Sequence, residues 1–339
     1  MSADTLTRGA DVSSAQGKRD VRPPQRIRIG LLGCGTVGRG VVQLVERERD
    51  RIRERHGVEL AIERILVRDL AKPRPGIDRR LLTTRATEVL DAHCDLIVEV
   101  VGGVHCAGAY VRRAIANGRH VVTANKALLA ECGRDLFAAA GRRGVTIGFE
   151  ASVCGGIPII RAIRDGLSAD TIDEVRGVLN GTSNYILTRI ESDGLSFDDA
   201  LRLAQERGFA EADPSLDIDG QDAAQKLRIL ASLAFGEPIV RGSIAGIRGV
   251  TRDDVERARD RGFVIRQVAT ARRVAGGIEL RVAPEECPAS DPLAFVRDEF
   301  NAVVVKARAA GEITLIGRGA GSGPTASAVV SDVIGIRSC

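Results

Sequence analysis

The sequence predicts an α/β protein in which a doubly wound parallel sheet is followed by a second unit of the α+β class. The 339 residues exceed the size at which one hydrophobic core stops growing, so we expect two units. Up to about Glu150, short apolar runs alternate with helix-like segments, as they do when helices connect parallel strands. Beyond that residue, strand-like segments surround fewer and longer helices, which indicates the second unit.

The first unit is expected to begin after a flexible leader. Residues 1–24 carry no hydrophobic period and end on two prolines. Short apolar runs then predict buried parallel strands at residues 27–32, 59–67, 96–101, 120–123 and 145–149. Helices are predicted at about residues 37–55, where His56 and Gly57 close the helix, at 108–117, and after the fourth strand.

The second unit contains strand-like segments at about residues 172–179, 277–282 and 302–308. The end of the chain reads as a strand, a glycine-rich loop and an apolar helix, which we expect to close back over the first unit. We therefore predict three parts: the leader at 1–24, a first domain made of 25–150 with about 318–339, and a second domain at 151–317.

Charge and composition exclude several classes of function. The 49 basic and 45 acidic residues give a net charge of +4, too balanced for a protein that grips a phosphate backbone. With no Trp and two Tyr, the chain also lacks stacking platforms for bases, so we expect no nucleic-acid partner. No apolar run approaches the roughly 18 residues of a membrane span, and the N-terminus has no apolar signal core. We expect a cytoplasmic protein without membrane contact.

The seven cysteines follow no pattern of a disulfide framework or a metal site. Cys34 and Cys154 lie in glycine-rich turns, where packing of a small side chain is the simpler explanation. Cys339 stands at the chain end, where residues are usually exposed. An intermolecular disulfide there is a hypothesis that non-reducing electrophoresis tests.

Residues 33–38 read GCGTVG, a G-x-G-x-x-G pattern directly after a predicted strand and at the start of a predicted helix. Gly33 permits a tight turn, Gly35 lets the backbone approach a pyrophosphate, and Gly38 allows close packing of helix on strand. The helix N-terminus faces the phosphates. A plain glycine turn is the alternative, but strand, spacing and helix agree with a Rossmann-type dinucleotide-binding domain. The cofactor-binding positions predicted here are Gly33, Gly35, Thr36, Val37 and Gly38.

The end of the second predicted strand indicates which nicotinamide cofactor is used. An acidic residue there accepts a hydrogen bond from a ribose hydroxyl, whereas a basic one faces a 2′-phosphate. Arg68, with Lys72 four residues on, favours NADP, but Asp69 suits NAD if the strand ends one residue later. Use of both cofactors stays open, as does a role of Arg68 as a solvated loop cation.

Ligands of such a sheet bind beyond the carboxyl ends of its strands. The third strand ends near Gly102 and the fourth at Thr123, so both are expected beside the cofactor, together with Lys126. A lysine near a nicotinamide can hold or exchange the proton of a substrate hydroxyl while the hydride leaves its carbon. Taken alone, Lys126 also fits an ordinary surface lysine.

A second group of charges lies in residues 208–227, which read GFAEADPSLDIDGQDAAQKL. Asp222 and Lys226 are four residues apart and share a helix face that continues to Ile229 and Leu233. A buried charge pair costs free energy unless further hydrogen bonds compensate, so it is more often kept for function than for stability. A solvated pair at a helix start is the alternative. Several carboxylates beside two lysines suit a small zwitterion.

Together these segments resemble homoserine dehydrogenase over about residues 27–336. The resemblance rests on six stretches in order, GLLGCGTVG, ANGRHVVTANKALLA, EASVCGGIPII, VLNGTSNYILT, GFAEADPSLDIDGQDAAQKL and GRGAGSGPTASAVVSD. It implies reversible NAD(P)-dependent interconversion of L-homoserine and L-aspartate 4-semialdehyde, on the route to threonine, isoleucine and methionine. It also implies a homodimer formed through the second domain.

By matching position, the resemblance implies that Lys126 and Lys226 are the catalytic lysines, and it leaves open which one transfers the proton. The substrate-binding residues that it implies are Glu211, Asp217, Asp222 and Thr182. The stretch EASVCGGIPII resembles the family's monovalent-cation site, and oxygen-only ligation suits a hard cation such as sodium. The ligands implied there are Glu150, Val153, Gly155 and Ile157. Gly321 lies in a loop that resembles the family's closing loop beside the nicotinamide.

The chain stops at Cys339 without the ACT domain of longer relatives and without an aspartate kinase half, so we expect no feedback by threonine through an ACT domain. Two alternatives to the resemblance stay open. One is another dehydrogenase on this scaffold, which a change at Glu211 or Asp222 would have favoured. The other is a non-catalytic sensor of dinucleotide redox state, which would need neither lysine.

Overall fold

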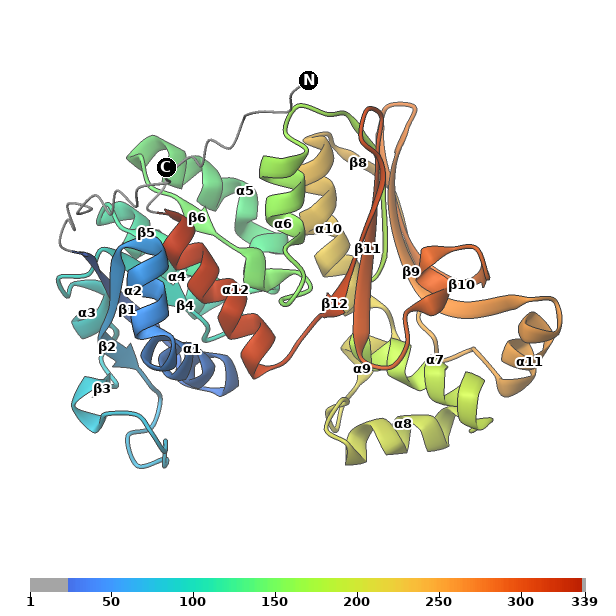
Figure 1. Cartoon of the computed structure of the whole chain (residues 1–339), viewed down its shortest axis with the longest axis horizontal. Coiled ribbons are helices and arrows are strands. Elements are labelled where there is room, and N and C mark those ends of the chain that lie inside the picture. The colour runs from blue at the N-terminus through green and yellow to red at the C-terminus, as the bar shows by residue number, and fades with distance from the viewer. Residues whose placement is uncertain (1–23, 337–339) are drawn as a thin grey trace, which may run out of the picture.

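The computed structural model describes residues 24–336 (Figure 1). Cys339 and the predicted leader, apart from its last residue, lie outside the described residues. None of the helices in the described range combines the length and the apolar character that a membrane crossing requires.

The first part of the chain forms, in order, β1 (Gln25–Leu32), α1 (Thr36–Arg47), α2 (Arg49–His56), β2 (Val58–Leu66), β3 (Leu82–Thr83), α3 (Ala86–Leu90), β4 (Leu96–Glu99), α4 (His105–Ala116), β5 (His120–Thr123), α5 (Lys126–Arg143) and β6 (Ile147–Gly148). The second part forms α6 (Ile159–Arg161), β7 (Ile172–Val178), α7 (Gly181–Asp193), α8 (Phe197–Glu206), α9 (Ser215–Ile218), α10 (Gln221–Phe235), β8 (Ile239–Ile244), α11 (Arg252–Asp260), β9 (Phe263–Val274), β10 (Gly277–Pro288), β11 (Phe300–Ala307) and β12 (Gly311–Arg318). The last helix, α12 (Ser322–Gly335), returns to the first part and lies along α1 (Figure 1).

The first sheet is a parallel sheet of the Rossmann type. Its strand order is β3-β2-β1-β4-β5-β6, and every neighbouring pair is parallel. Helices α1, α2 and α12 cover one apolar cluster, and α3, α4 and α5 cover another. The predicted doubly wound fold is confirmed, and the order of the strands reverses between β1 and β4, where such sheets bind their ligands.

One predicted helix is in fact two. The helix expected at about 37–55 breaks at Glu48, whose backbone (φ −99°, ψ 10°) leaves the helical range between α1 and α2. The core face of α1 buries three valines, whereas the charged stretch after it buries Ile52 alone. Because so little apolar surface holds this second segment, the chain can turn at Glu48 and still bury Ile52. Gly57 ends α2 in the left-handed conformation, as predicted (φ 62°).

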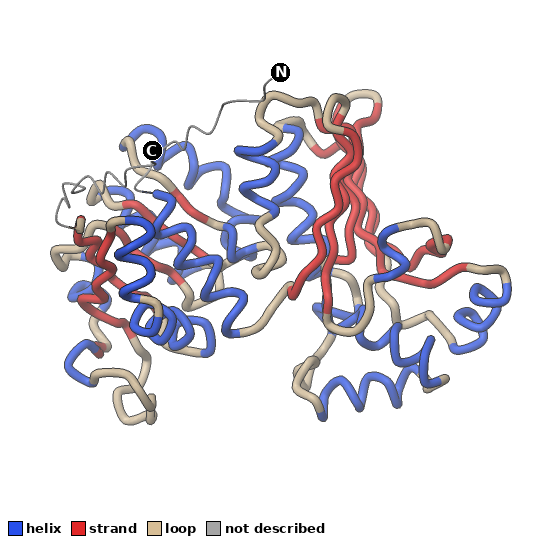
Figure 2. Tube along the Cα trace, viewed as in Figure 1, coloured by secondary structure: helices blue, strands red, loops and turns tan. Residues whose placement is uncertain are grey.

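The second sheet is mixed, in agreement with the predicted α+β unit. Its order is β12-β11-β7-β9-β10-β8, in which β8 runs parallel to β10 and the other pairs are antiparallel. Figure 2 shows α10 on the face of this sheet that looks toward the first sheet. Side chains of α10 and of the second sheet pack there in one apolar cluster. Helices α7, α8 and α11 form a separate cluster at one end of the sheet (Figure 1).

The sequence does not predict β9, although this strand pairs with β10 along its whole length. Its buried positions include Arg266 and Gln267, which interrupt the alternation of apolar and polar residues. Arg266 is held by the Glu191 carboxylate (Nη1 to Oε2, 2.9 Å) and by the Ala294 carbonyl oxygen (Nη2, 3.0 Å). A charged side chain therefore occupies a position that the apolar pattern assigns to the core.

Two segments connect the sheets and lie side by side. One leaves the first sheet after β6, and the other returns to it after β12. The Gly155 N–H donates to the Gly319 carbonyl oxygen (2.9 Å), and the Gly156 N–H donates to the Arg318 carbonyl oxygen (2.9 Å). The outgoing and returning segments are therefore bonded to each other.

Candidate active site

The glycine loop between β1 and α1 leaves its amides open to a ligand. Gly35 precedes α1, and no side chain caps the helix there. The N–H groups of the first turn, which includes Thr36 and Val37, can therefore bind phosphate oxygens. A Cβ at Gly35 would meet nothing within 4 Å, whereas a Cβ at Gly38 would overlap the Gly33 carbonyl oxygen. Packing thus requires glycine at position 38, and position 35 leaves room for a ligand.

The basic residues after β2 lie in an exposed loop. Neither Arg68 nor Lys72 pairs with another side chain among the described residues. The Asp69 carboxylate accepts a hydrogen bond from the Ala71 N–H (2.7 Å). Arg74 donates to the carbonyl oxygens of Asp69 and Lys72 (2.9 Å each) and holds the loop in shape. The loop thus engages the acidic residue and leaves two cations for an anionic ligand.

The closing loop before α12 lies against the glycine loop. Gly321 has φ 115°, a conformation that favours glycine. The hydroxyl of the next residue, Ser322, donates to the Thr36 carbonyl oxygen (2.9 Å). Predicted cofactor positions from the two ends of the described chain are therefore neighbours in space.

A buried carboxylate that the sequence pattern did not single out lies at the carboxyl end of β4. Glu99 accepts a hydrogen bond from the Thr123 hydroxyl on Oε2 (2.6 Å) and from the N–H groups of Val101 (2.9 Å) and Gly102 (3.2 Å) on Oε1. One carboxylate therefore holds Thr123 and Gly102, two positions expected beside the cofactor. The signal in the sequence is a single glutamate inside the apolar run LIVEVV.

The two lysines expected to be catalytic meet on one carboxylate. Lys126, the first residue of α5, places Nζ 3.1 Å from Asp222 Oδ1. Lys226, one turn after Asp222 on α10, places Nζ 2.8 Å from Oδ2 and also donates to the Leu179 carbonyl oxygen (2.7 Å). Because α5 packs on the first sheet and α10 on the second, Asp222 joins the two parts of the chain.

Burial and charge act in opposite directions on this cluster. Burial raises the pKa of the Asp222 carboxyl, but the ammonium groups of Lys226 and Lys126 outweigh it, so the pKa lies below its ordinary value. Burial lowers the pKa of Lys226, but the Asp222 carboxylate outweighs it, so the pKa is raised. For Asp217, burial prevails over the hydrogen bond from Asn180, and the pKa is raised. At neutral pH, Asp222 is ionised and Lys226 is protonated.

Asn180 links the carboxylates to the start of α7. Its Nδ2 donates to Asp217 Oδ1 (2.7 Å) and to Asp222 Oδ2 (2.8 Å). Its Oδ1 caps α7 by accepting a hydrogen bond from the Ser183 N–H (2.7 Å). Asparagine is a common N-cap residue, but only the fold shows that this amide also meets two carboxylates.

Thr182 lies beside Asp217, whereas no bond joins the Glu211 side chain to the cluster in the described part of the chain. The Thr182 hydroxyl donates to the Phe209 carbonyl oxygen (2.7 Å), which joins α7 to the loop before α9. Glu211 is exposed, and its carboxylate bonds to no other side chain among the described residues. Its backbone carbonyl oxygen accepts a hydrogen bond from Gln205 (3.2 Å). The structure therefore does not bring Glu211 into contact with the two lysines.

The loop after β6 offers backbone oxygens to a cation. Within the described residues, the carbonyl oxygens of Val153 and Gly155 accept no hydrogen bond, and that of Ile157 accepts one (2.8 Å). The buried Glu150 carboxylate accepts hydrogen bonds from two N–H groups of α6 (2.8 and 3.1 Å). These oxygens fit a hard monovalent cation. In the same range, no three His, Cys, Asp or Glu side chains gather as a metal site.

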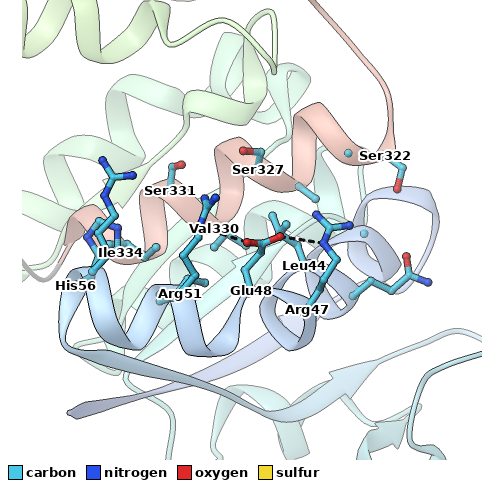
Figure 3. A pocket seen from close by; sticks show the side chains of 16 residues that line it. Leu44, Arg47, Glu48, Arg51, His56, Ser322, Ser327, Val330, Ser331 and Ile334 are labelled. Carbon is cyan, nitrogen blue, oxygen red and sulfur yellow. Dashed lines mark hydrogen bonds and ion pairs between the residues drawn. The ribbon is translucent and has the colours of Figure 1, made fainter. Parts of the chain in front are cut away.

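A cavity of about 710 Å³ lies between α1 and α2 on one side and α12 on the other (Figure 3). Figure 3 shows Glu48 on its wall, paired with both Arg47 and Arg51. Neither lysine of the cluster and none of its carboxylates lines this cavity. The chemistry of the side chains, and not the size of a cavity, therefore locates the candidate active site.

Comparison with protein families agrees with the predicted fold and with the resemblance. The family model described as homoserine dehydrogenase matches residues 158–334, and the model described as the NAD-binding domain of homoserine dehydrogenase matches residues 33–150. The homoserine dehydrogenase of Bacillus subtilis is 42% identical over 314 residues, which cover 91% of this chain and 72% of the relative.

Solved structures agree as well. A homoserine dehydrogenase from Thiobacillus denitrificans matches with a TM-score of 0.88 and 46% identity, over 92% of this chain and 73% of the other. A hyperthermophilic archaeal homoserine dehydrogenase in complex with NADPH matches with a TM-score of 0.78 and 28% identity, over 92% of this chain and 98% of the other. The chain therefore belongs to the homoserine dehydrogenase family and is an NAD(P)-dependent oxidoreductase that acts on a CH–OH group.

Proposed function

We propose that this chain catalyses the reversible oxidation of L-homoserine to L-aspartate 4-semialdehyde, in the biosynthesis of threonine, isoleucine and methionine. The observation that carries the proposal is the bridge in which Lys126 and Lys226, from the two parts of the chain, share the Asp222 carboxylate. Membership of the family supports the reaction.

The cluster suits proton transfer at a substrate hydroxyl. Lys226 stays protonated and is held on two sides, so we assign it to binding the substrate oxygen. The Lys126 side chain is 36% exposed and bonds to Asp222, so it can exchange protons with solvent. We assign the proton transfer to Lys126, whose Nζ, once it has passed a proton to solvent, takes the hydroxyl proton as the hydride leaves the same carbon. NAD(P), when bound, accepts that hydride.

The substrate's ammonium and carboxylate need partners of opposite charge. We assign the ammonium to the carboxylates of Asp217 and Glu211, and the carboxylate to the start of α7 beside Thr182. Asp222 keeps both lysines in place. The exposure of Glu211 supports a role in which its side chain turns toward the substrate on binding.

The first sheet fits a nicotinamide dinucleotide. Open amides at the start of α1 suit the pyrophosphate, and the unpaired Arg68 and Lys72 suit a 2′-phosphate, so we propose a preference for NADP over NAD. We propose that residues 25–150 with 318–339 form the NAD(P)-binding domain and that 151–317 form the substrate-binding and dimerisation domain. The further cofactor contacts that we propose are Gly33, Gly38, Gly102, Thr123, Lys126 and Gly321.

Three further features belong to the proposal. A sodium ion at Glu150, Val153, Gly155 and Ile157 is supported by the unbonded carbonyl oxygens of that loop. A homodimer formed through the second domain and a cytoplasmic location are supported by the family resemblance.

The test is the reduction of NADP, and separately of NAD, by L-homoserine, followed at 340 nm. Wild type should turn over, and Lys126→Ala and Lys226→Ala should each lose at least about 100-fold in kcat. NADPH binding, followed by fluorescence, should persist in both variants. The control Arg134→Ala removes an exposed cation of α5 and should leave kcat unchanged. Tight dinucleotide binding without turnover in either direction would overturn homoserine as the substrate.

Added amines separate the roles of the two lysines. Methylamine should restore part of the activity of Lys126→Ala, because this side chain is partly open to solvent and its Nζ carries the proton in our assignment. It should not restore Lys226→Ala, where the lost ammonium is buried against Leu179 and Asp222. The reverse pattern would assign proton transfer to Lys226.

A further inference from the structure

We propose that Glu99 is a positioning residue for this reaction, whose carboxylate holds the glycine turn after β4 and the start of α5 in one fixed geometry. The inference rests on the proposed function, because α5 begins with Lys126. Glu99 is 0% exposed and ends β4, a central strand between β1 and β5. It therefore lies where the strands present their carboxyl ends to a ligand.

The surroundings of Glu99 distinguish it from an ordinary buried acid. Three donors converge on its two oxygens: the Thr123 hydroxyl and the N–H groups of Val101 and Gly102. Among the described residues, no Lys, Arg or His pairs with it. A carboxylate buried without a cation costs free energy unless hydrogen bonds compensate. A neutral side chain would avoid that cost. We therefore attribute the acidic residue at position 99 to the three donor groups that its carboxylate holds in place.

The contacts of Glu99 lead directly to the start of α5. While the Thr123 hydroxyl donates to Glu99, its oxygen accepts a hydrogen bond from the Asn125 N–H (3.0 Å). Asn125 is the N-cap of α5, and its Oδ1 accepts a hydrogen bond from the Leu128 N–H (3.1 Å). The carboxylate thus fixes the hydroxyl, the hydroxyl fixes the cap, and the cap fixes the helix.

The glycine turn closes the chain of contacts into a ring. The Asn125 Nδ2 donates to the Gly103 carbonyl oxygen (2.6 Å), and the neighbouring Gly102 N–H donates to Glu99. Both glycines have φ 73°, a conformation that other residues rarely adopt. Lys126 follows Asn125 directly, so the ring sets the direction in which its side chain leaves the backbone toward the substrate cluster. Misplacement of a catalytic group by about 1 Å costs about 100-fold in rate.

The test compares substitutions that change one bond of this ring. Glu99→Gln keeps the shape of the side chain and removes its charge, Thr123→Val removes the hydroxyl at similar volume, and Thr123→Ser keeps the hydroxyl. We expect Glu99→Gln and Thr123→Val to lower kcat about 10- to 100-fold, with the KM for homoserine changed less than about threefold. Thr123→Ser should stay within about threefold of wild type.

Thr83→Val is the matched control. Thr83 is also buried at the end of a strand, and its hydroxyl oxygen also accepts a hydrogen bond from the N–H two residues on (Arg85, 3.1 Å). Its hydroxyl bonds to no carboxylate in the described part of the chain. The kcat of Thr83→Val should equal that of wild type, so the loss in Thr123→Val cannot be attributed to removing any buried hydroxyl.

Two readouts separate positioning from folding. Glu99→Gln should weaken NADPH binding, measured by fluorescence, about fivefold, because Gly102 and Thr123 are proposed cofactor contacts. The double variant Glu99→Gln with Thr123→Val should be no slower than the slower single variant, because both changes break the same contact. Losses in kcat that multiply, or single variants within twofold of an active wild type, would overturn the proposal.

Two further outcomes are a Glu99→Gln variant that does not fold and a wild type that does not turn over homoserine. If Glu99→Gln does not fold, Thr123→Val and Thr123→Ser carry the test, since both keep the two N–H donors on Glu99 Oε1. If wild type fails to turn over homoserine, the proposed function fails. The NADPH dissociation constants of the variants then still test whether Glu99 orders the glycine turn, and unchanged constants would overturn that role.

Discussion

The two sides of the candidate active site hold their buried carboxylates in opposite ways. Glu99, at the carboxyl end of β4 in the first sheet, is held by N–H and O–H donors that fix the backbone. Asp222, on α10, is held by the ammonium groups of Lys126 and Lys226. Removing the Glu99 carboxylate would loosen the backbone around it, whereas removing the Asp222 carboxylate would leave two ammonium groups without their anion. Apart from the ammonium group of Lys126, the first part of the chain thus contributes mainly shape to the site, and the second contributes mainly charge.

The largest effect is expected from Asp222→Asn, which would show whether charge is what the second part contributes. The change leaves Lys226 buried without its anion, so the free energy of unfolding should fall by about 3–5 kcal/mol. The kcat should fall at least about 1,000-fold, because both lysines lose their partner. Urea unfolding and the assay at 340 nm measure the two effects.

Asp219→Asn is the matched control for this substitution. Asp219 lies three residues earlier, its side chain is 41% exposed, and it pairs with Arg248 at the surface. Its replacement should change stability by no more than about 1 kcal/mol. If Asp222→Asn were as stable as this control, the contrast between the two carboxylates would be wrong.

The pH dependence of stability sharpens the same contrast. Because the pKa of Asp222 is lowered in the fold, its contribution is complete above about pH 4 and is lost as the pH falls through the folded-state pKa. Because the pKa of Lys226 is raised, its contribution is complete below about pH 10 and is lost as the pH rises through the folded-state pKa.

The difference in unfolding free energy between wild type and Asp222→Asn should therefore be largest near pH 5–7. It should shrink below about pH 4, where wild type loses the Asp222 contribution. It should also shrink toward pH 10, because in the variant burial acts on Lys226 without the carboxylate and the lysine can shed its proton. Urea unfolding across this range measures the difference, and a flat profile contradicts the assigned charges.

Two glycines test whether the first part contributes shape. A Cβ at Gly38 overlaps the Gly33 carbonyl oxygen, so Gly38→Ala should lower the free energy of unfolding by about 1–3 kcal/mol. Gly35 has an ordinary φ (−83°) and open space around it, so Gly35→Ala should fold normally but bind NADPH about tenfold more weakly. Thermal unfolding and fluorescence titration separate the pair, and equal destabilisation of both variants would contradict the prediction.

The smallest effect is expected at the exposed end of β2. Arg68→Ala should raise the KM for NADP about five- to tenfold, leave the KM for NAD unchanged, and alter stability by less than about 0.5 kcal/mol. Lys72→Ala should act in the same direction. If Arg68→Ala left both constants unchanged and Asp69→Ala raised the KM for NAD, the acidic residue would be the one that contacts the ribose.

The sequence predicts the first part well where the causes are local. The turn and helix start at residues 33–38 depend on residues within a few positions, and they lie where they are expected. The break at Glu48 is not predicted, because it depends on where the Ile52 side chain packs in the core. Glu99 is visible in the sequence as an acid in an apolar strand, but its bond from the Thr123 hydroxyl becomes visible only when β4 and β5 are placed side by side.

In the second part, the unpredicted features depend on contacts far apart in the chain. The partners of Arg266 lie 75 and 28 residues away, which is why β9 shows no clean alternation in its own sequence. Asn180 meets carboxylates 37 and 42 residues further on. An asparagine before a helix predicts a cap, but no local pattern predicts which groups its amide will reach.

The paired segments between the sheets limit how the two parts can move. Because hydrogen bonds join the outgoing strand of the connection to the returning one, at Gly155 with Gly319 and at Gly156 with Arg318, the two cannot bend independently. A bend in one of these segments must therefore be accompanied by a bend in the other. Lys126 and Asp222 belong to different parts of the chain, so their 3.1 Å separation depends on how the two parts are placed against each other. A ligand that displaces this ion pair therefore also removes one of the bonds that hold the two parts together.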